Sequence, residues 1–267
     1  MKELLRRSLT GIVYVVLLLS TVFLSSDAFD FLFMVFGLGC LYEFKRIVRI
    51  KGYHVFVAYL ALWWTYIYLI QDNTAIFILL MLTLTVNLAL LVFLFSKSER
   101  SFNYLQKFLI SIFYIGGGCI FLTMIPYTEN EFAKFLIMGI FILIWVNDSF
   151  AYLVGKSIGK NKLFPSVSPK KTIEGSFGGL IFAMLAGYIL SKYETSIDTA
   201  QWLILSFVIV VMGSLGDLLQ SKFKRMAGVK DSGAILPGHG GIWDRLDSLV
   251  FAAPFAYLTL KIFFYVS

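Results

Sequence analysis

Three aspartates near the C-terminus have a spacing that could bind a metal ion. Asp217 lies where an apolar run turns polar, and Ser221 would follow one helical turn later on the same side. Asp244 and Asp247 are three residues apart just before the next apolar run, so a helix would place both carboxylates on one face. If these two helix ends are neighbours, the three carboxylates converge and repel one another in a low-dielectric setting. Because Mg²⁺ prefers carboxylate, water and phosphate oxygens, the spacing predicts a Mg²⁺ site at Asp217, Asp244 and Asp247.

The segment between these two helix ends also carries basic side chains and an imidazole. A competing interpretation is that the aspartates only form salt bridges with Arg225, Lys230 and Arg245, since exposed ion pairs are common and weak. His239 is surrounded by glycines in a stretch unsuited to a helix. We expect His239 to contact phosphate, and general acid–base catalysis stays open for it. Carboxylates in this number could also bridge a second cation.

A second charged segment follows an earlier apolar run. Asp148 falls inside that run, where an ionisable group is costly and normally faces a cavity or a partner; a structural ion pair with a nearby lysine is the alternative. Ser168-Pro169 has the form of an N-cap followed by proline at the first helical position, so we expect Lys170 and Lys171 in the first turn of a helix. Cations there oppose the helix dipole unless an anion binds the free N–H groups. The pattern predicts phosphate binding at both lysines, and a simple topological charge is the alternative.

The elements that must carry these residues are membrane helices. The chain has 267 residues, of which 59% are hydrophobic and 27 are Phe, and its mean hydropathy of +0.82 excludes a water-soluble globular domain. A spanning helix needs about 20 mostly apolar residues. The sequence predicts an all-α, polytopic integral membrane protein with about nine transmembrane helices. The expected spans are 8–25, 28–44, 53–70, 74–95, 105–126, 132–155, 172–192, 200–220 and 248–266.

Basic residues between the spans predict the orientation of the chain. With the N-terminus in the cytoplasm, 20 of the 23 Lys and Arg residues fall on the cytoplasmic side, leaving Lys134, Lys192 and Lys261 on the other. We therefore expect a multi-pass protein of the cell membrane whose active site faces the cytoplasm. One membrane-embedded catalytic domain would cover 1–267, with N-terminal helices in 1–126 and the site-bearing helices and loops in 127–267.

The remaining composition bears on partners and packing. The net charge of +7 is mostly a charge of the cytoplasmic face and would attract anionic lipid headgroups of the bilayer. The chain has no soluble basic patch with interleaved aromatic residues, so we do not expect nucleic acid as a partner. Glycines at 116–118 in the fifth span, and Gly175, Gly178 and Gly179 in the seventh, predict close helix packing.

One long stretch also resembles a known family. From Ser221 to Asp247 the chain matches the signature of the phosphatidate cytidylyltransferases, also called CDP-diacylglycerol synthases, without departure. The matching pattern is Ser221-x-Phe-Lys-Arg-x4-Lys230-Asp231-x-Gly-x2-Leu-Pro-x-His-Gly-Gly-Ile-x-Asp-Arg-Leu-Asp247. The upstream Ser-Pro-Lys-Lys-Thr-Ile-Glu-Gly at 168–175 is also similar to that family, and length and hydropathy extend the resemblance to the whole chain.

This resemblance implies Mg²⁺-dependent transfer of the cytidylyl group of CTP to phosphatidate, giving CDP-diacylglycerol and pyrophosphate at the cytoplasmic membrane surface. The metal-binding carboxylates would be Asp217, Asp244 and Asp247, and Lys171 and His239 would complete the catalytic group. The substrate-binding candidates are Asp148, Ser168, Lys170, Lys171, Ser221, Lys224, Arg225, Lys230, Asp231 and Arg245.

Two other functions compete with this one. A CTP-dependent enzyme acting on a prenyl-type lipid or a lipid alcohol would share the same polar residues, because lipid-facing surfaces carry no readable code. A membrane transporter is disfavoured, since the acidic groups cluster at one face and the chain has no internal repeat. The sequence leaves the oligomeric state open, with a homodimer as one alternative.

Overall fold

The computed structural model describes residues 2–70, 72–96, 102–127, 132–236, 238 and 240–266. Nearly all of these residues are helical. The elements are α1 (Lys2–Leu24), α2 (Ser26–Val48), α3 (His54–Trp64) with the π-helical η1 (Thr65–Leu69), α4 (Asn73–Phe95), α5 (Tyr104–Leu109) with the π-helical η2 (Ile110–Gly116), α6 (Gly117–Met124), the 3-10 turn η3 (Ile125–Tyr127), α7 (Lys134–Ile158), β1 (Lys162–Phe164), β2 (Ser168–Thr172), α8 (Ile173–Leu190), α9 (Thr199–Met226) and α10 (Trp243–Val266).

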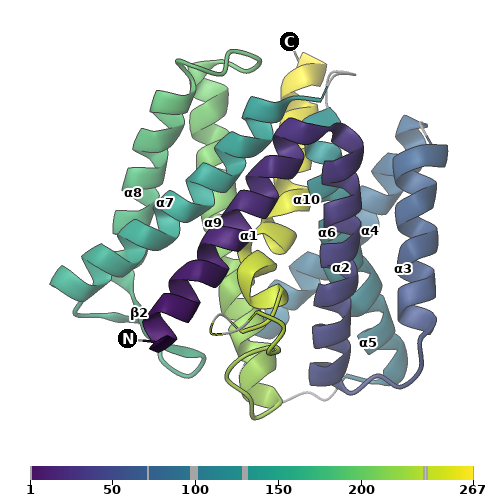
Figure 1. The fold of residues 1–267 in the computed structure, drawn as a ribbon, viewed down its shortest axis with the longest axis horizontal. Helices are drawn as coiled ribbons and strands as arrows, with labels where there is room; N and C mark the ends of the chain where they lie inside the picture. Colours follow the sequence, from purple (N-terminus) through teal and green to yellow (C-terminus); the bar gives the residue numbers. More distant parts are fainter. Residues whose placement is uncertain are drawn as a thin grey trace.

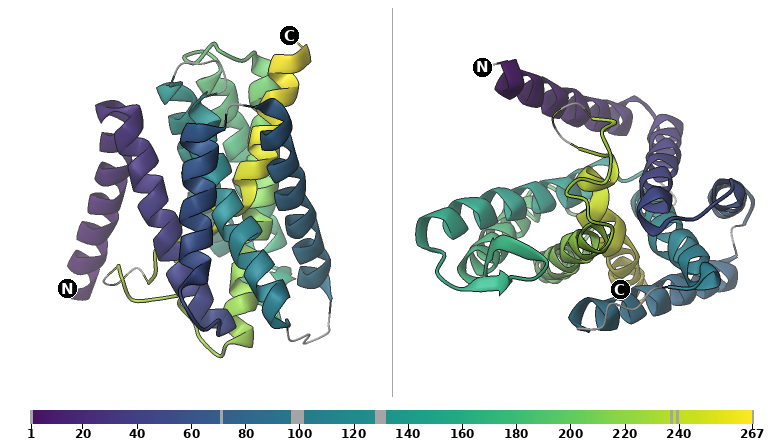
Figure 2. Two further views of the ribbon diagram at one scale, coloured as in Figure 1. Left: turned by 90° about the vertical axis from the view of Figure 1, so that its right-hand side faces the viewer. Right: turned by 90° about the horizontal axis from the view of Figure 1, so that it is seen from below.

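The helices run side by side in one bundle. Helix α10 lies at its centre, with α7, α8 and α9 on one side and α2, α4 and α6 on the other (Figure 1). Viewed from below, α1 extends away from the rest of the bundle, and the described part of the chain between α9 and α10 lies at the end of the bundle that faces the viewer (Figure 2). The hairpin β1–β2 and that connecting segment occupy the same end of the molecule, so the polar segments singled out in the sequence share one end.

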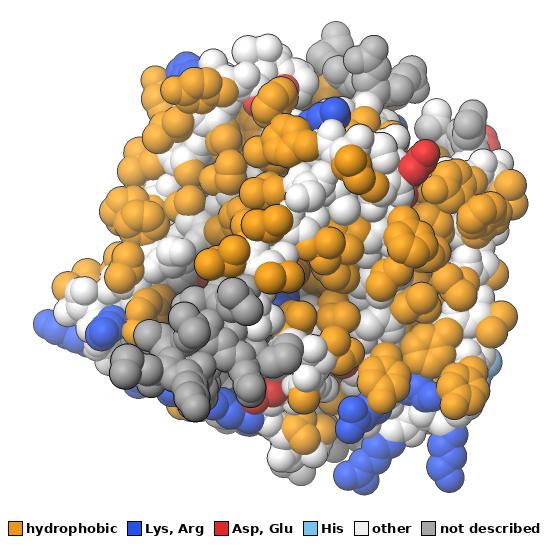
Figure 3. Space-filling view, in the orientation of Figure 1, with side chains coloured by type: hydrophobic (Ala, Val, Ile, Leu, Met, Phe, Trp, Pro, Cys, Tyr) orange, Lys and Arg blue, Asp and Glu red, His pale blue; other side chains and the backbone are white. Residues whose placement is uncertain are grey.

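Each of the nine predicted spans is helical. Within the described residues, six helical segments are long and apolar enough to cross a membrane, namely 73–95, 104–127, 134–158, 173–190, 199–226 and 243–265. The apolar parts of the first and third, Thr10–Leu24 and His54–Leu69, are shorter. On the face of the molecule shown in Figure 3, hydrophobic side chains cover much of the surface, and Lys and Arg gather mainly at the lower edge. The protein is thus an all-α membrane protein as predicted, to which the structure adds one short hairpin.

The hairpin corrects the predicted start of the seventh span. Strand β2 includes Lys170 and Lys171, which the Ser168-Pro169 pattern had placed in the first turn of a helix. Antiparallel pairing joins Lys162 to Thr172 and Phe164 to Ser168. The helix begins only at Ile173, where the Thr172 side chain accepts a hydrogen bond from Gly175 N at 3.1 Å and acts as the N-cap. Proline is compatible with an edge strand as well as with the first turn of a helix, so Ser168-Pro169 by itself did not distinguish the two.

Helix α8 secures the base of this hairpin. The Glu174 carboxylate in its first turn accepts hydrogen bonds from the backbone N–H groups of Lys160 and Asn161, and from the Asn161 side chain at 2.7 Å. Helix α8 itself packs closely on α7, as its glycines predicted: a Cβ on Gly178 would lie 2.6 Å from Val154 Cγ2, and one on Gly179 would lie 2.6 Å from Asn147 Oδ1. The two lysines therefore lie in a hairpin whose base is fixed by hydrogen bonds to α8.

Candidate functional site

Two cavities adjoin at Asp148 of α7. The larger, of about 350 Å³, lies between α7, α8, α9 and the hairpin. Its polar lining includes Asp148, Lys170, Lys171, Ser176, Ser214 and Asp217. Two lysines from β2 and carboxylates from two different helices therefore face one space. Such a cavity can hold a polyanion beside a cation, because basic groups and oxygen donors are both within reach.

The smaller cavity, of about 220 Å³, lies between α1, α7 and the first turns of α10. Its polar lining includes Thr10, Tyr14, Asp148, Asp244, Arg245 and Asp247. Helix α1 contributes Gly11 and Val15 as well, and its neighbours Ile12, Val13 and Val16 are largely exposed. One wall of this cavity is thus a helix whose outer surface is apolar, and the opposite wall carries charge.

An ion pair between Lys171 and Asp217 joins the hairpin to α9. The Lys171 Nζ lies 2.5 Å from Asp217 Oδ2, and both side chains are about one-third exposed. Burial lowers the pKa of Lys171, but the Asp217 carboxylate more than offsets that effect and raises the pKa above its ordinary value. The predicted neighbour Ser221 is present one turn later and donates a hydrogen bond to Asp217 Oδ1 at 3.4 Å. Lys171 therefore stays cationic at the cavity wall.

Helices α9 and α10 meet beside these residues. A Cβ on Gly216 would lie 2.8 Å from the backbone oxygen of Asp247, so the absence of a side chain at Gly216 allows this approach. The carboxylates of Asp148, Asp217 and Asp247 are close enough to repel one another electrostatically. Asp247 also accepts a hydrogen bond from Ser248 N at 2.8 Å. Two of the three predicted metal ligands are therefore neighbours, and Asp148 joins them.

Asp244 departs from the predicted arrangement. Its Oδ1 lies 2.7 Å from Lys224 Nζ, and its Oδ2 accepts hydrogen bonds from Ser232 N at 2.8 Å and Gly241 N at 2.9 Å. Only 7% of this side chain is exposed, and both of its oxygens already accept hydrogen bonds from the protein. Within the described part of the chain, no group of three or more His, Cys, Asp or Glu side chains is arranged to hold a metal ion. Asp217 and Asp247 interact electrostatically, whereas Asp244 is held by Lys224 and two backbone N–H groups, so a metal site at the three aspartates stays a prediction.

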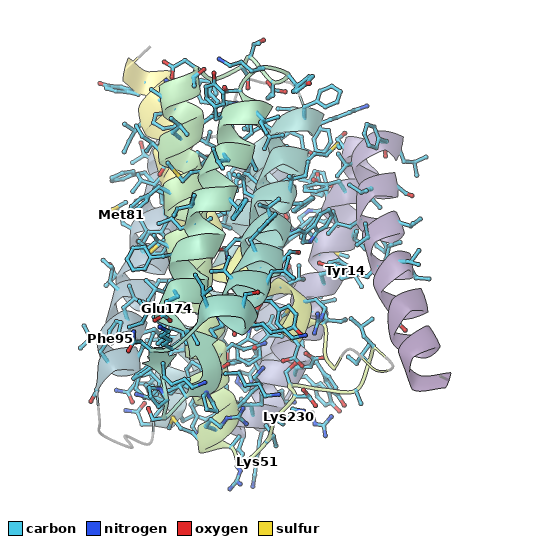
Figure 4. The ribbon with its side chains drawn as sticks, turned by 90° about the vertical axis from the view of Figure 1, so that its left-hand side faces the viewer. Tyr14, Lys51, Met81, Phe95, Glu174 and Lys230 are labelled. Carbon is cyan, nitrogen blue, oxygen red and sulfur yellow. The ribbon has the colours of Figure 1, made fainter. Side chains whose placement is uncertain are left out.

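The other predicted residues fall into two groups. Lys224 is buried, and besides its contact with Asp244 it donates to Gln220 Oε1 at 2.7 Å, so it is an internal cation rather than part of a cavity lining. Arg225, Lys230 and Asp231 are exposed beyond the two cavities, and Figure 4 shows Lys230 at the same end of the bundle as Lys51. Ser168 pairs within the hairpin. His239 lies outside the described residues.

Two buried acids of α2, Asp30 and Glu43, were not among the predicted residues. Glu43 on α2 has no exposed surface, and its carboxylate accepts hydrogen bonds from Ser232 Oγ, Ile242 N and Trp243 N. An acidic residue in an apolar run was the signal that identified Asp148, and the same signal was present here. The apolar run around Glu43 ends at the basic residues Lys45, Arg46 and Arg49, and the segment was therefore interpreted only as a determinant of membrane orientation.

Comparison with known proteins identifies the family. The model of the cytidylyltransferase family matches residues 5–263. A Bacillus subtilis protein named phosphatidate cytidylyltransferase is 33% identical over 280 residues, covering 98% of this chain and 100% of the relative. Proteins of the same name from Staphylococcus saprophyticus and Staphylococcus aureus are 41% and 42% identical over 167 residues, covering 62% of each chain. This chain therefore belongs to the cytidylyltransferase family.

Proposed function

We propose that this protein transfers the cytidylyl group of CTP to phosphatidate, with release of pyrophosphate and formation of CDP-diacylglycerol. The observation that carries this proposal is the similarity, along nearly the whole chain, to a full-length relative named phosphatidate cytidylyltransferase. It is supported by a polar site at one end of a membrane bundle, where a charged nucleotide and a lipid headgroup could both be reached.

The two cavities suggest how the substrates divide. The larger cavity takes the triphosphate, because Lys170 and Lys171 can offset its charge. The smaller cavity takes the phosphatidate headgroup, because the outer surface of α1 beside it is apolar and Arg245 lies on the other side. Asp148 lines both, so the reacting phosphates would meet beside it. The acyl chains would stay in the bilayer along α1.

The reaction needs positioning and charge neutralisation more than proton transfer. The phosphatidate phosphate is already anionic at neutral pH, and one of its oxygens attacks the α-phosphorus of CTP. A new P–O bond forms as the bond to the bridging oxygen of pyrophosphate breaks, and pyrophosphate leaves with that electron pair. Lys171, held by Asp217, stabilises the negative charge that moves onto the leaving group. No residue has to remove a proton from the nucleophile.

We further propose that Mg²⁺ is required. The donor set fits this ion: Asp217 and Asp247 offer only oxygen ligands, they repel each other and Asp148, and Mg²⁺ is usually held by one or two carboxylates together with water and phosphate. When bound, it would neutralise phosphate charge. Asp148 would lie beside the bound Mg²⁺ and could help Asp217 and Asp247 to bind a second cation. Asp244 stays with Lys224 in this proposal.

The proposed orientation places the site at the cytoplasmic face of the cell membrane. Nine spans with a cytoplasmic N-terminus are supported by the nine helical segments of the described residues, six of them long and apolar enough to cross a membrane, and by the Lys and Arg residues that gather at the end with the hairpin. Single cysteines at Lys162 on the hairpin and at Lys192 after α8 would be labelled with a membrane-impermeant maleimide. The hairpin cysteine should react only after cells are opened. Labelling of the hairpin from outside intact cells would reverse the orientation.

The function is tested with purified protein in detergent, CTP labelled at the α-phosphate and a panel of lipids. We expect label in a lipid product only with phosphatidate, and only when Mg²⁺ is present. A polyprenyl phosphate and a diacylglycerol are the comparison substrates, because the prenyl-lipid and lipid-alcohol alternatives predict that one of these is used instead. Labelling of either without labelling from phosphatidate would replace the proposed substrate.

A further inference from the structure

Glu43 is a buried carboxylate that the reaction outlined above does not use. It lies near the C-terminal end of α2, with no exposed surface. Three donors converge on it: Ser232 Oγ lies 2.7 Å from Oε2, Ile242 N lies 2.9 Å from Oε1, and Trp243 N lies 2.9 Å from Oε2. Ser232 and Ile242 belong to the connection from α9 to α10 and Trp243 is the first residue of α10, so the donors lie 189 to 200 residues away in sequence. Burying a carboxylate so completely costs free energy unless hydrogen bonds satisfy its oxygens, as these three donors do.

The contacts make Glu43 an N-cap supplied by another helix. The first N–H groups of a helix have no acceptor within it, and α10 begins at Trp243. The backbone N–H groups of Ile242 and Trp243 both end on Glu43, so its negative charge lies at the positive end of the helix dipole. The direction and position of the first turn of α10 therefore depend on a side chain of α2.

A second carboxylate holds the same segment from the other side. Asp244 accepts hydrogen bonds from Ser232 N and Gly241 N, while Glu43 accepts one from Ser232 Oγ. Ser232 is thus hydrogen-bonded to both acids, and Gly241, just before α10, donates to the same Asp244 carboxylate. Asp247 follows Asp244 by three residues, so any movement of this turn is transmitted to the carboxylate beside Asp217.

Two glycines make room for the Glu43 carboxylate. A Cβ on Gly233 would lie 2.6 Å from Glu43 Oε1, 2.9 Å from Cδ and 3.1 Å from Cγ, and it would meet nothing else as close. A Cβ on Gly241 would collide with Glu43 Oε2 and with Ser232 Oγ. Gly233 and Gly241 therefore cannot carry a side chain without displacing the Glu43 carboxylate, which lies against their backbone.

We infer that Glu43 is a positioning residue for cytidylyl transfer: through Ile242, Trp243 and Ser232 it sets where Asp244 and Asp247 stand relative to Asp217 and Lys171. This inference rests on the proposed function. Glutamine is a poor replacement because its NH₂ group would face at least one of three donors. Aspartate keeps the charge but withdraws it by one methylene, so it should recover part of the function.

The test compares carboxylate-to-amide changes at the two ends of α2. Glu43→Gln is the test variant. Asp30→Asn is its matched control, because Asp30 is also buried, accepts the Tyr127 hydroxyl at 2.8 Å, and is 13 residues away, or about 20 Å along the helix. For each purified variant we would measure kcat, KM for CTP and Tm, and hydrogen exchange of the peptide covering 231–247. Glu43→Asp tests rescue.

We expect kcat of Glu43→Gln to fall by about 100-fold, the loss that a displacement near 1 Å produces, with KM for CTP changed by less than about threefold, because the lysine cavity is untouched. Exchange in 231–247 should rise. Asp30→Asn should keep the wild-type kcat and exchange even if its Tm falls, and Glu43→Asp should lie between. Wild-type kcat in Glu43→Gln, or an equal loss in Asp30→Asn, would overturn the inference.

Gly233→Ala covers the case in which Glu43→Gln does not fold. The added methyl group would push the carboxylate away from the segment without removing any hydrogen-bonding group, so the same loss of kcat at constant KM is expected. If this variant has the wild-type kcat, the inference fails. Failure of the proposed function is a separate outcome: the wild-type protein would then not label phosphatidate at all, while the exchange comparison would still show whether Glu43 holds the segment.

Discussion

Replacing Lys171 with alanine should reduce catalysis far more than stability. The Lys171–Asp217 pair has a 2.5 Å N–O distance, and its side chains are 31% and 30% exposed. Coulomb's law gives about 1.7 kcal/mol for this separation in water and about 6.6 kcal/mol at an effective dielectric constant of 20. Desolvation and side-chain ordering oppose that attraction, and measured pairs at such exposure contribute at most about 1 kcal/mol. We therefore expect the free energy of unfolding to fall by about 1 kcal/mol or less.

The catalytic loss should be larger because a preorganised cation acts on charge that develops during the reaction. Removal of one such group from an active site typically costs about 3 kcal/mol, or a factor of 10²–10³ in rate. We expect kcat/KM of Lys171→Ala for CTP to fall by about that factor. The assay is the transfer of α-labelled CTP to phosphatidate, with thermal unfolding measured on the same preparation.

The hairpin itself offers the control. Lys162 on β1 is exposed, pairs with Thr172 and is absent from the described lining of both cavities, so Lys162→Ala removes a similar charge nearby. It should leave kcat/KM within about twofold of wild type. If Lys171→Ala behaves like Lys162→Ala, then Lys171 is a topological charge and its place in the mechanism is refuted.

Three further predictions concern the Lys171–Asp217 pair, the two acids of α10 and the contact between α7 and α8. Burial lowers the pKa of Lys171, but the Asp217 charge outweighs that effect and raises the pKa above its ordinary value of 10.5. The stability from that pair is therefore complete below this pH and is lost only as the pH rises through the higher pKa of the folded state. The Tm difference between wild type and Lys171→Ala should thus stay constant from about pH 6 to pH 9, and a difference that vanishes within that range contradicts this prediction. Asp247→Asn should abolish turnover at every Mg²⁺ concentration with little change in Tm. Asp244→Asn should also lower Tm by several degrees because it leaves buried Lys224 without its carboxylate; equal Tm values would show that the two acids have the same role. Gly178→Val should destabilise the α7–α8 pair by about 2 kcal/mol or more, measured by thermal unfolding, since even its Cβ would overlap Val154, and Phe177→Val on the exposed neighbouring position is the control.

The positions of the helices could be predicted from the sequence because membrane segments obey a local rule. In lipid each backbone N–H and C=O group must be satisfied within its own helix, so a sufficiently long apolar run is a helix whatever surrounds it. The runs around 74–95 and 200–220 were therefore recognisable without knowledge of any contact. The spacing of Asp217 and Ser221 was equally local, and the structure has both on one side of α9.

The ends of the helices were harder to predict because capping depends on contacts distant in sequence. Ser168-Pro169 read locally as a helix start, yet pairing with β1 drew Lys170 and Lys171 into a strand. The N-terminus of α10 is capped by Glu43 of α2, and no pattern within a few residues of either group could reveal that partner.

The assignment of each acid was decided by tertiary structure. Asp217, Asp244 and Asp247 are chemically alike, and the sequence predicted all three near helix ends, so they were interpreted as one set; in the structure α9 continues to Met226, nine residues beyond Asp217. Folding brings buried Lys224 and two backbone N–H groups to Asp244, and brings Asp148 to the other two. A carboxylate held by three protein donors, as Asp244 is, has little capacity left for a cation, whereas Asp217 and Asp247 accept fewer of the described hydrogen bonds and retain more of that capacity. The sequence by itself determined which side chains gather at one end of the bundle, and the packing of α2, α7, α9 and α10 decided which of them remain available for chemistry.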